Sequence, residues 1–274
     1  MLKITPYDEV TRIDSARRIA GRGYYWTTAY LVDGLLVDSG CAYSAIELVT
    51  RLRGNTLMHL FNTHSHEDHI GANGLLQEEH KDLIVYAHPL ALSVLAAPRE
   101  TQPQQLYRRV MWGWPEPSSA LAVEDGQWIE TKKYRYQVIY TPGHSPDHIC
   151  LYEPERGWLF TGDLFVGGRD RALRAGCDIW QIIASLKRVH ALPLQVLFPG
   201  SARVRPDPRG ELASKIAYLE ETGERVLELR RKGWSTGAIA RAVFGGPMLI
   251  EFVTAGHFTR RRLVESYLAL AEQR

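Results

Sequence analysis

Five residues with metal-binding side chains are crowded into the segment from His64 to His69, which reads His-Ser-His-Glu-Asp-His. The segment follows a short apolar stretch at 56–61 that is typical of a buried strand. Imidazole and carboxylate groups are the ligands of zinc and similar ions in catalytic sites, where three protein ligands leave one position open for water. In an extended turn His64 and His66 point the same way, and Asp68 and His69 are then aimed at a neighbouring position. The segment therefore predicts a metal centre that can serve two ions.

Two distant residues extend this predicted set. His144 and Asp163 each follow a predicted strand directly after a glycine, where sheet proteins often place site residues. Either residue alone is as well explained as part of a turn, and a single histidine is usually solvated or hydrogen-bonded rather than a ligand. Together with the crowded segment, His144 and Asp163 complete a ligand set.

The order and spacing of these motifs resemble the metallo-β-lactamase fold superfamily over roughly residues 15–208. The motifs are His64-x-His66-x-Asp68-His69, Pro142-Gly143-His144, Gly162-Asp163 and Val37-Asp38-Ser39-Gly40. The resemblance implies an α/β protein, an αβ/βα sandwich of two mixed sheets with the metals at one edge. Because Asp68 is present and no cysteine stands at a ligand position, the motif looks like the hydrolase branch that includes glyoxalase II.

The resemblance also implies a role for each motif residue. It assigns the ligands to two ions: His64, His66 and His144 to one, Asp68 and His69 to the other, with Asp163 bridging both. Asp38 is implied to be a buried carboxylate that braces the histidine segment from outside the ligand set. Asp68 is the expected catalytic residue, because an ionised carboxylate there can orient a water or accept its proton.

One position departs from the superfamily pattern. The last core strand normally ends in Pro-Gly-His, whose histidine completes the second ion, but this chain reads Pro199-Gly200-Ser201. A neutral hydroxyl is a poor zinc ligand, so the second ion is expected to be weaker, absent, or held by another group. His148 is the nearest spare imidazole, and the favoured interpretation is a strand residue with a local hydrogen bond. His190 and His257 are expected in helices.

The chain alternates strand and helix patterns up to about residue 208, and after that only helix patterns. We therefore predict a catalytic domain at 1–208 and a small helical appendage at 209–274. The appendage resembles the small winged-helix-type unit found on the β-lactamase-like endoribonucleases. The pattern Pro-Gly-His-x-x-Asp-His at 142–148 of the catalytic domain also resembles that group of enzymes. Between 99 and 119 we expect a long, partly helical loop. Its aromatic and basic side chains are candidates for a wall over the site or for anchors of the loop: Tyr107, Arg108, Arg109, Trp112 and Trp114.

Composition excludes several classes of protein. The 274 residues are 45% hydrophobic with a net charge of +2, which is typical of a globular protein and gives no nucleic-acid signature. The three cysteines form no C-x-x-C pair, so a reducing, cytoplasmic location is expected. The chain shows no apolar run of membrane-spanning length, and no membrane partner is expected. The oligomeric state cannot be predicted from the sequence.

These features predict a metal-dependent hydrolase in which a metal-activated water attacks an anionic small-molecule ester or thioester. The anionic preference is suggested by two loops rich in arginine: Arg169, Arg171, Arg174, Arg203, Arg205 and Arg209. The same arginines could equally form a solvated surface. Zinc, as one or two ions, is the expected metal, and manganese and iron suit the same ligands. A metal-dependent endoribonuclease is the first alternative, although nucleic acid is the less favoured partner, and a binding protein with a degenerate site is the second.

Overall fold

The computed structural model describes residues 1–201 and 203–269. Its first sheet has seven strands, whose spatial order is the same as their order in the sequence. These strands are β1 (Leu2–Tyr7), β2 (Val10–Ile19), β3 (Arg22–Val32), β4 (Leu35–Val37), β5 (His59–Phe61), β6 (Ile84–Ala87) and β7 (Leu121–Ala122). Pairing is antiparallel from β1 to β4 and parallel from β4 to β7. Asp33 and Gly34 both have positive φ, 46° and 78°, as a tight turn between β3 and β4 requires.

The second sheet has five strands in the order β13-β11-β10-β9-β8. They are β8 (Trp128–Glu130), β9 (Arg135–Tyr140), β10 (Ile149–Glu153), β11 (Trp158–Gly162) and β13 (Val196–Pro199). Only β11 and β13 pair in parallel among these described strands. Because β10 runs opposite to both neighbours, β9, β11 and β13 all point the same way and their carboxyl ends meet at one edge.

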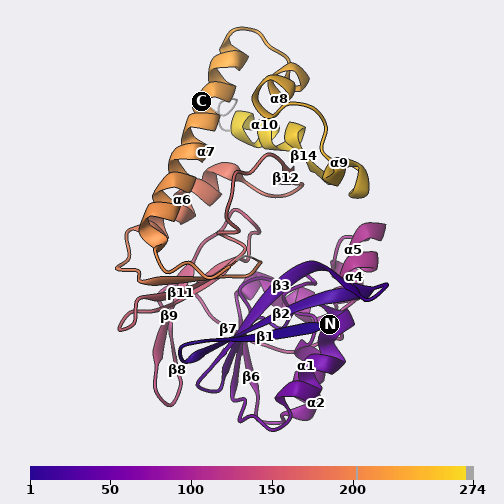
Figure 1. Ribbon diagram of the computed structural model, residues 1–274, viewed down its shortest axis with the longest axis vertical. Coiled ribbons are helices and arrows are strands. Elements are labelled where there is room, and N and C mark those ends of the chain that lie inside the picture. The colour runs from indigo at the N-terminus through magenta and orange to yellow at the C-terminus, as the bar shows by residue number, and fades with distance from the viewer. Residues whose placement is uncertain (202, 270–274) are drawn as a thin grey trace.

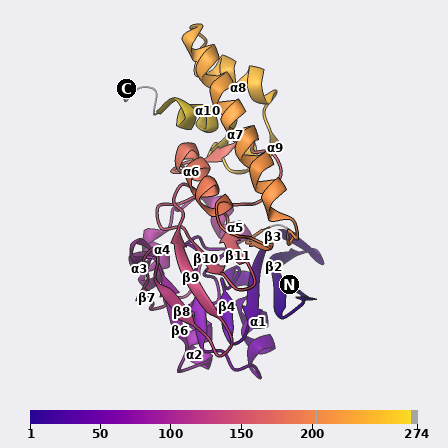
Figure 2. The same cartoon turned by 90° about the vertical axis from the view of Figure 1, so that its left-hand side faces the viewer.

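Three apolar layers hold the sheets and helices together (Figures 1 and 2). The middle layer lies between the two sheets and includes Tyr30, Phe160 and Phe198, with the two phenylalanine rings stacked at 4.8 Å. A second layer joins the first sheet to α1 (Ala45–Leu52), α2 (Asn73–Glu79) and α3 (Leu92–Ala96). A third joins the second sheet to α6 (Ile179–His190) and α7 (Pro208–Arg231). The predicted αβ/βα sandwich of two mixed sheets is confirmed.

The C-terminal region consists of α7, α8 (Thr236–Phe244), α9 (Leu249–Val253) and α10 (Arg260–Ala269). Our expectation of helix alone after residue 209 is wrong, because β14 (Phe258–Thr259) pairs antiparallel with β12 (Leu173–Arg174). In Figure 1 this pair lies at the end of the appendage that faces the two sheets. Ser235 caps the N-terminus of α8, because its hydroxyl accepts a hydrogen bond from the Ala238 amide at 3.3 Å. The boundary at 208/209 stays a prediction, since the third apolar layer continues from the second sheet into the appendage.

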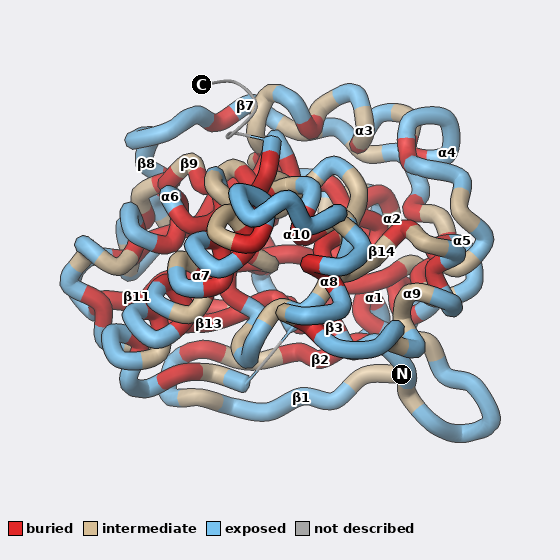
Figure 3. Tube along the Cα trace, turned by 90° about the horizontal axis from the view of Figure 1, so that it is seen from above, coloured by how far each residue is buried: buried red, intermediate tan, exposed pale blue. Residues whose placement is uncertain are grey.

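Other segments differ from the sequence expectation or refine it. Strands β1 and β2 form one edge of the first sheet. Figure 3 shows that β1 is largely exposed, so its sequence lacks the alternation of apolar and polar residues that indicates a strand. The segment after residue 97 is partly helical, with α4 (Pro98–Thr101) and α5 (Leu106–Met111). Two short 3₁₀ turns, Ala42–Ser44 and Pro89–Ala91, precede α1 and α3. Among the described helices, none combines the length and the apolar character needed to cross a bilayer.

Candidate metal centre

The predicted ligands follow the carboxyl ends of different strands. The segment from His64 to His69 follows β5, His144 follows β9, and Asp163 follows β11. Since β9 and β11 point the same way, and the ends of β4 and β5 lie together in the other sheet, these residues converge at one edge of the sandwich. This is the usual place for a site in sheets with parallel strands.

Three histidines form the first group. Ligand atoms of His64, His66 and His144 all lie within 4.8 Å of one another. Nδ1 of His66 is 3.0 Å from Nε2 of His144, and the ring centres of His64 and His66 are 4.3 Å apart. Burial lowers the pKa of each of the three well below the usual value for histidine, which favours the neutral, metal-binding form.

Asp163 lies between this group and His69. One of its oxygens is 3.6 Å from Nε2 of His144, and the other is 3.5 Å from Nε2 of His69. His64, His69 and Asp163 form a second group with ligand atoms within 4.8 Å. Asp68 lies at its margin, with an oxygen 3.9 Å from Nε2 of His69. The position of Asp163 is the one that a residue shared by two ions would occupy.

The residues present fit a divalent cation. Nε2 of His64 and Nε2 of His69 are buried and have no hydrogen-bond partner within the described part of the chain. Unpaired buried polar atoms are costly, and a cation between them would satisfy both. Burial acts to lower the pKa of His69, but nearby carboxylates, Asp163 foremost, raise it well above the usual value. A position where carboxylates favour a proton so strongly is also one where a cation can take its place.

Asp38 braces this arrangement from behind. Its carboxylate accepts hydrogen bonds from the Thr63 amide and hydroxyl, each at 2.8 Å, and lies 2.7 Å from Nδ1 of His69. Nδ1 of His69 is thereby engaged, and Nε2 is directed into the site. Asp38 has a φ of 60°, a conformation that non-glycine residues adopt at a cost and that is found at functional sites. The Asp38 carboxylate therefore contacts the ligand segment without belonging to either ligand group.

Ser201 and His148 take different places at the margin. Ser201 is exposed, and its hydroxyl donates to Asp163 at 3.4 Å. His148 is fully buried, with Nδ1 2.8 Å from the Thr141 hydroxyl and a ring centre 5.1 Å from that of His64. Burial lowers the pKa of His148 to about 4. The favoured interpretation of His148 as a residue with a local hydrogen bond agrees with this geometry.

The arginine-rich loops contribute one side chain to the centre. Of the six loop arginines, and within the described ranges, Arg174 contacts a candidate ligand, through Nε2 of His66. Four of the others make contacts elsewhere: Arg171 to a carbonyl of α8, Arg203 and Arg205 to Glu211, and Arg169 to the ring of Tyr218. We expected both loops to present arginines to the site, and the structure places Arg174 there.

The long loop also reaches the appendage. The Tyr107 hydroxyl lies 2.5 Å from Nδ1 of His257, which occupies a turn before β14 rather than the expected helix. Trp112 is 9% exposed and packs between Tyr107 and Tyr25, with ring centres 5.7 and 6.0 Å away. Trp112 is therefore an anchor in this structure. The sequence did not reveal the contact of Tyr107 with His257, since the two residues are 150 positions apart.

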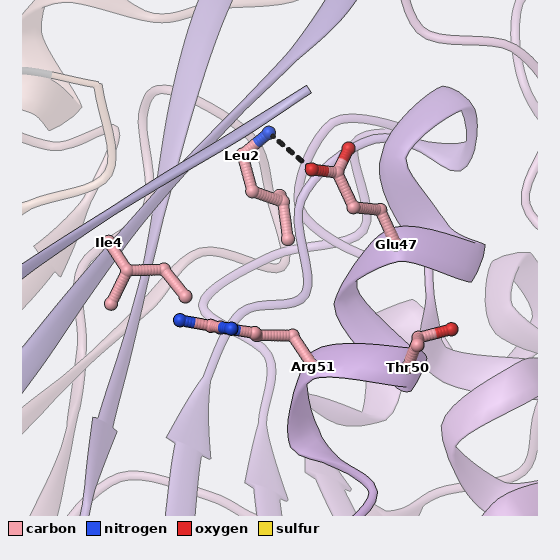
Figure 4. A pocket seen from close by; sticks show the side chains of 5 residues that line it. All are labelled: Leu2, Ile4, Glu47, Thr50 and Arg51. Carbon is pink, nitrogen blue, oxygen red and sulfur yellow. Dashed lines mark hydrogen bonds between the residues drawn. The ribbon is translucent and has the colours of Figure 1, made fainter.

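A pocket on another face does not belong to this centre. It lies between the edge strand β1 and helix α1, and Figure 4 shows its lining residues, Leu2, Ile4, Glu47, Thr50 and Arg51. The amide of Leu2 donates to Glu47 at 3.3 Å across the pocket. None of these five residues is among the candidate ligands.

The two mixed sheets, with histidines and carboxylates gathered at one edge, define a two-sheet sandwich with a candidate metal centre. Residues 27–201 match the family described as the Metallo-beta-lactamase superfamily. The match covers more than half of the chain, and the chain belongs to this superfamily, as the motifs predicted.

Two curated relatives illustrate the similarity. The chain is 28% identical over 244 residues to the lactamase-like protein nscB of Aspergillus fumigatus, a match that covers 80% of this chain and 66% of the relative. It is 29% identical over 159 residues to a hydroxyacylglutathione hydrolase of Synechococcus sp., covering 58% of this chain and 54% of the relative. The chain thus spans between about half and two thirds of the length of these relatives.

Two solved structures share the fold. A metallo-beta-lactamase family protein, TTHA1429 from Thermus thermophilus, superposes with a TM-score of 0.66 at 21% identity, covering 96% of this chain and 93% of that one. The protein TTHA1623, solved in a di-iron-bound form, superposes with a TM-score of 0.57 at 31% identity, covering 70% of this chain and 94% of that one.

Proposed function

We propose that the protein is a metal-dependent hydrolase that cleaves an anionic small-molecule ester or thioester. The observation that carries the proposal is the convergence of His64, His66 and His144 with Asp163 between them and His69. A divalent cation bound there supplies a water of lowered pKa and polarises the bond under attack. The hydroxyacylglutathione hydrolases among the relatives support this reaction class by their name.

The protein residues divide the remaining work. His64, His66 and His144 would hold one cation, and His69, Asp68 and Asp163 would hold or share another. Asp68 lies at the margin of the second group, 3.9 Å from Nε2 of His69, and a carboxylate there can orient a water or accept its proton. Asp68 is therefore our candidate for orienting the attacking water and accepting its proton.

Arg174 supports the anionic character of the substrate. It contacts His66, so its guanidinium group lies beside the candidate ligands, and its buried Nε has no hydrogen-bond partner among the residues that the structure describes. A guanidinium group there suits a substrate carboxylate or phosphate. Zinc, as one or two ions, is the proposed metal, while the di-iron form of TTHA1623 supports iron as a candidate and manganese suits the same ligands.

The test compares two series of acyl esters and acyl thioesters. One series carries a carboxylate, and in the matched series a neutral amide replaces that carboxylate. The loaded protein is expected to hydrolyse the anionic compounds, and a chelator should abolish turnover. In Arg174→Gln, kcat/KM for the anionic compounds should fall by about 10- to 100-fold, because a charge-assisted hydrogen bond contributes roughly 1.5–3 kcal/mol. The neutral compounds should be affected little. Arg169→Gln is the control, since Arg169 lies on Tyr218. Equal losses for both compound series would contradict the anion-binding role.

A metal-dependent endoribonuclease is the second candidate, favoured by the pattern at 142–148. In the structure, Asp147 of that pattern accepts the Ser65 amide at 2.8 Å and so braces the ligand segment. Several basic side chains of the appendage are paired with carboxylates, which reduces the positive surface available to RNA. These pairs are Arg225 and Lys232 with Glu228, Arg260 with Glu251, and Arg261 with Glu265. Metal-dependent cleavage of RNA across a range of salt would favour this candidate, and its absence would remove it.

A binding protein with a degenerate site is the remaining alternative. It predicts that wild type and Asp163→Ala show the same background hydrolysis. We propose a small molecule as the partner, a cytoplasmic location and no membrane partner, and leave the oligomeric state open.

A further inference from the structure

A buried ion pair ties the metal-ligand segment to helix α5. Arg108 is 1% exposed and Glu67 is fully buried, and both carboxylate oxygens of Glu67 are engaged by the guanidinium group. The Nε of Arg108 donates to Glu67 at 2.6 Å. Glu67 lies between the candidate ligands His66 and Asp68 in the sequence. The pair therefore joins the ligand segment to a residue 41 positions away.

The residues between the ligands are held as a set. Ser65 lies between His64 and His66, its carbonyl accepts a hydrogen bond from Gln102, and its amide donates to Asp147 at 2.8 Å. Gln102 also accepts a hydrogen bond from Arg108 at 3.2 Å. Alternate positions of the segment thus carry the candidate ligands, while the positions between them bind the segment formed by α4 and α5.

Stability alone does not account for this pair. Removing two charges from water is expensive, and buried ion pairs are often replaced by apolar residues at little cost. Nη1 of Arg108 is buried without a partner within the described residues, so its desolvation is not fully compensated. What the bidentate geometry does provide is a fixed position for the backbone that carries the ligands.

We propose that Arg108 is a positioning residue of the metal centre: through Glu67 and Gln102 it fixes the ligand segment in the geometry that binds the metal. This inference rests on the metal centre of the proposed function, but it does not depend on the substrate. It also gives helix α5, which lies outside the sandwich, a defined role. Tyr107, the neighbour of Arg108, contacts His257, so the brace is itself supported by the appendage.

The experiment uses Co²⁺ as the probe, with its dissociation constant and visible ligand-field spectrum as readouts. The variants are Arg108→Met, Arg108→Lys, Gln102→Ala and the double variant Glu67→Met with Arg108→Met. We expect Arg108→Met to weaken Co²⁺ binding by about 10- to 100-fold, the range seen when residues that orient ligands are removed, and to change the spectrum. Arg108→Lys should restore part of the affinity, because it keeps the charge but not the bidentate contact.

The double variant separates positioning from stability. It leaves no unpaired buried charge, so its unfolding midpoint should lie closer to that of the wild type than that of Arg108→Met does, while Co²⁺ binding stays weak. Arg99→Met is the matched control, since Arg99 forms an exposed ion pair with Glu116 at 3.1 Å. If Arg108→Met does not fold, Gln102→Ala and the double variant decide. Wild-type Co²⁺ affinity and spectrum in the folded variants would overturn the proposal. Because Co²⁺ binding needs no turnover, a failure of the proposed hydrolase activity would be recognised separately.

Discussion

Two loops that reach the metal centre differ in how their side chains are held. The loop from His64 to His69 is almost entirely buried and forms hydrogen bonds or ion pairs with Asp38, Arg108 and Asp147. The loop from Pro199 to Ser201 presents one exposed hydroxyl, which donates to Asp163 at 3.4 Å. Its backbone is also held: the Gly200 amide donates to Gly162 at 2.8 Å, the Thr28 amide donates to the Gly200 carbonyl at 2.5 Å, and the Tyr30 hydroxyl donates to the Pro199 carbonyl at 2.7 Å.

The difference teaches where the metal affinity of this chain resides. A ligand whose second nitrogen and backbone are already fixed loses little freedom when a cation binds, so the first loop is arranged in advance. The second loop is fixed through its backbone, but it offers only a hydroxyl, which is a weak ligand. The preorganised ligand side chains are therefore those of the His64–His69 loop, and the position near Ser201 depends more on what is bound.

The largest expected effect comes from removing a ligand of the first group. His144→Ala deletes one of three imidazoles while leaving the Asp38 brace intact. Metal catalysis supplies several kcal/mol, so a loss of about 4 kcal/mol would lower kcat/KM by about 10³-fold. Elemental analysis should show the loss of the tightly bound ion in the same variant. His190→Ala, a substitution on helix α6, is the control and should keep the wild-type metal content.

A tightly bound ion retained in His144→Ala, with turnover unchanged, would contradict the division between the two loops. It would mean that the group of His69, Asp163 and His64 holds the working cation without His144.

A smaller effect is expected from the brace itself. Asp38→Asn keeps the shape of the side chain but replaces the charged acceptor for Nδ1 of His69. Loss of such a partner typically costs 10- to 100-fold in metal affinity, so we expect weakened binding by about that factor, measured by competition with a chelator. Asp125→Asn is a matched control, because Asp125 also accepts a backbone amide, from Tyr140 at 2.8 Å, but lies on the surface.

Wild-type metal affinity in Asp38→Asn would show that burial alone fixes the ligand loop. The comparison between the loops would then rest on accessibility to water and not on bracing.

The sequence predicts the densely packed parts of this centre better than its supports. The His64–His69 segment and Asp38 stand in local motifs whose order and spacing resemble the metallo-β-lactamase superfamily, and that resemblance implied both the fold and the convergence of the ligands. Asp147 and Ser65 are 82 positions apart, and Glu67 and Arg108 are 41 apart. Contacts of that range leave no periodic signal, and a glutamate between ligands looks like a solvated residue until its partner is seen.

The edge strand β1 and the short strand β14 also leave little signal in the sequence. Most residues of β1 are exposed, so its sequence lacks the alternation of apolar and polar residues that marks a half-buried strand. Strand β14 has two residues and is defined by its pairing with β12, which depends on how the appendage folds back. Arg174 lies in β12, so its approach to His66 could not be separated in sequence from the other arginines of its loop.

The smallest expected change in turnover, and the sharpest test of the comparison, comes from supplying the missing ligand. Ser201→His places an imidazole where the hydroxyl already points at Asp163, and a neutral imidazole is a far better zinc ligand than a hydroxyl. We expect metal content to rise from about one ion per chain to about two, measured by elemental analysis of protein purified without chelator. Ser201→Ala is the control and should bind as the wild type does. Two ions in the wild type itself would mean that the serine at the end of the Pro199–Ser201 loop does not limit binding of the second ion, and that Asp68, His69 and Asp163 suffice without a fourth protein ligand.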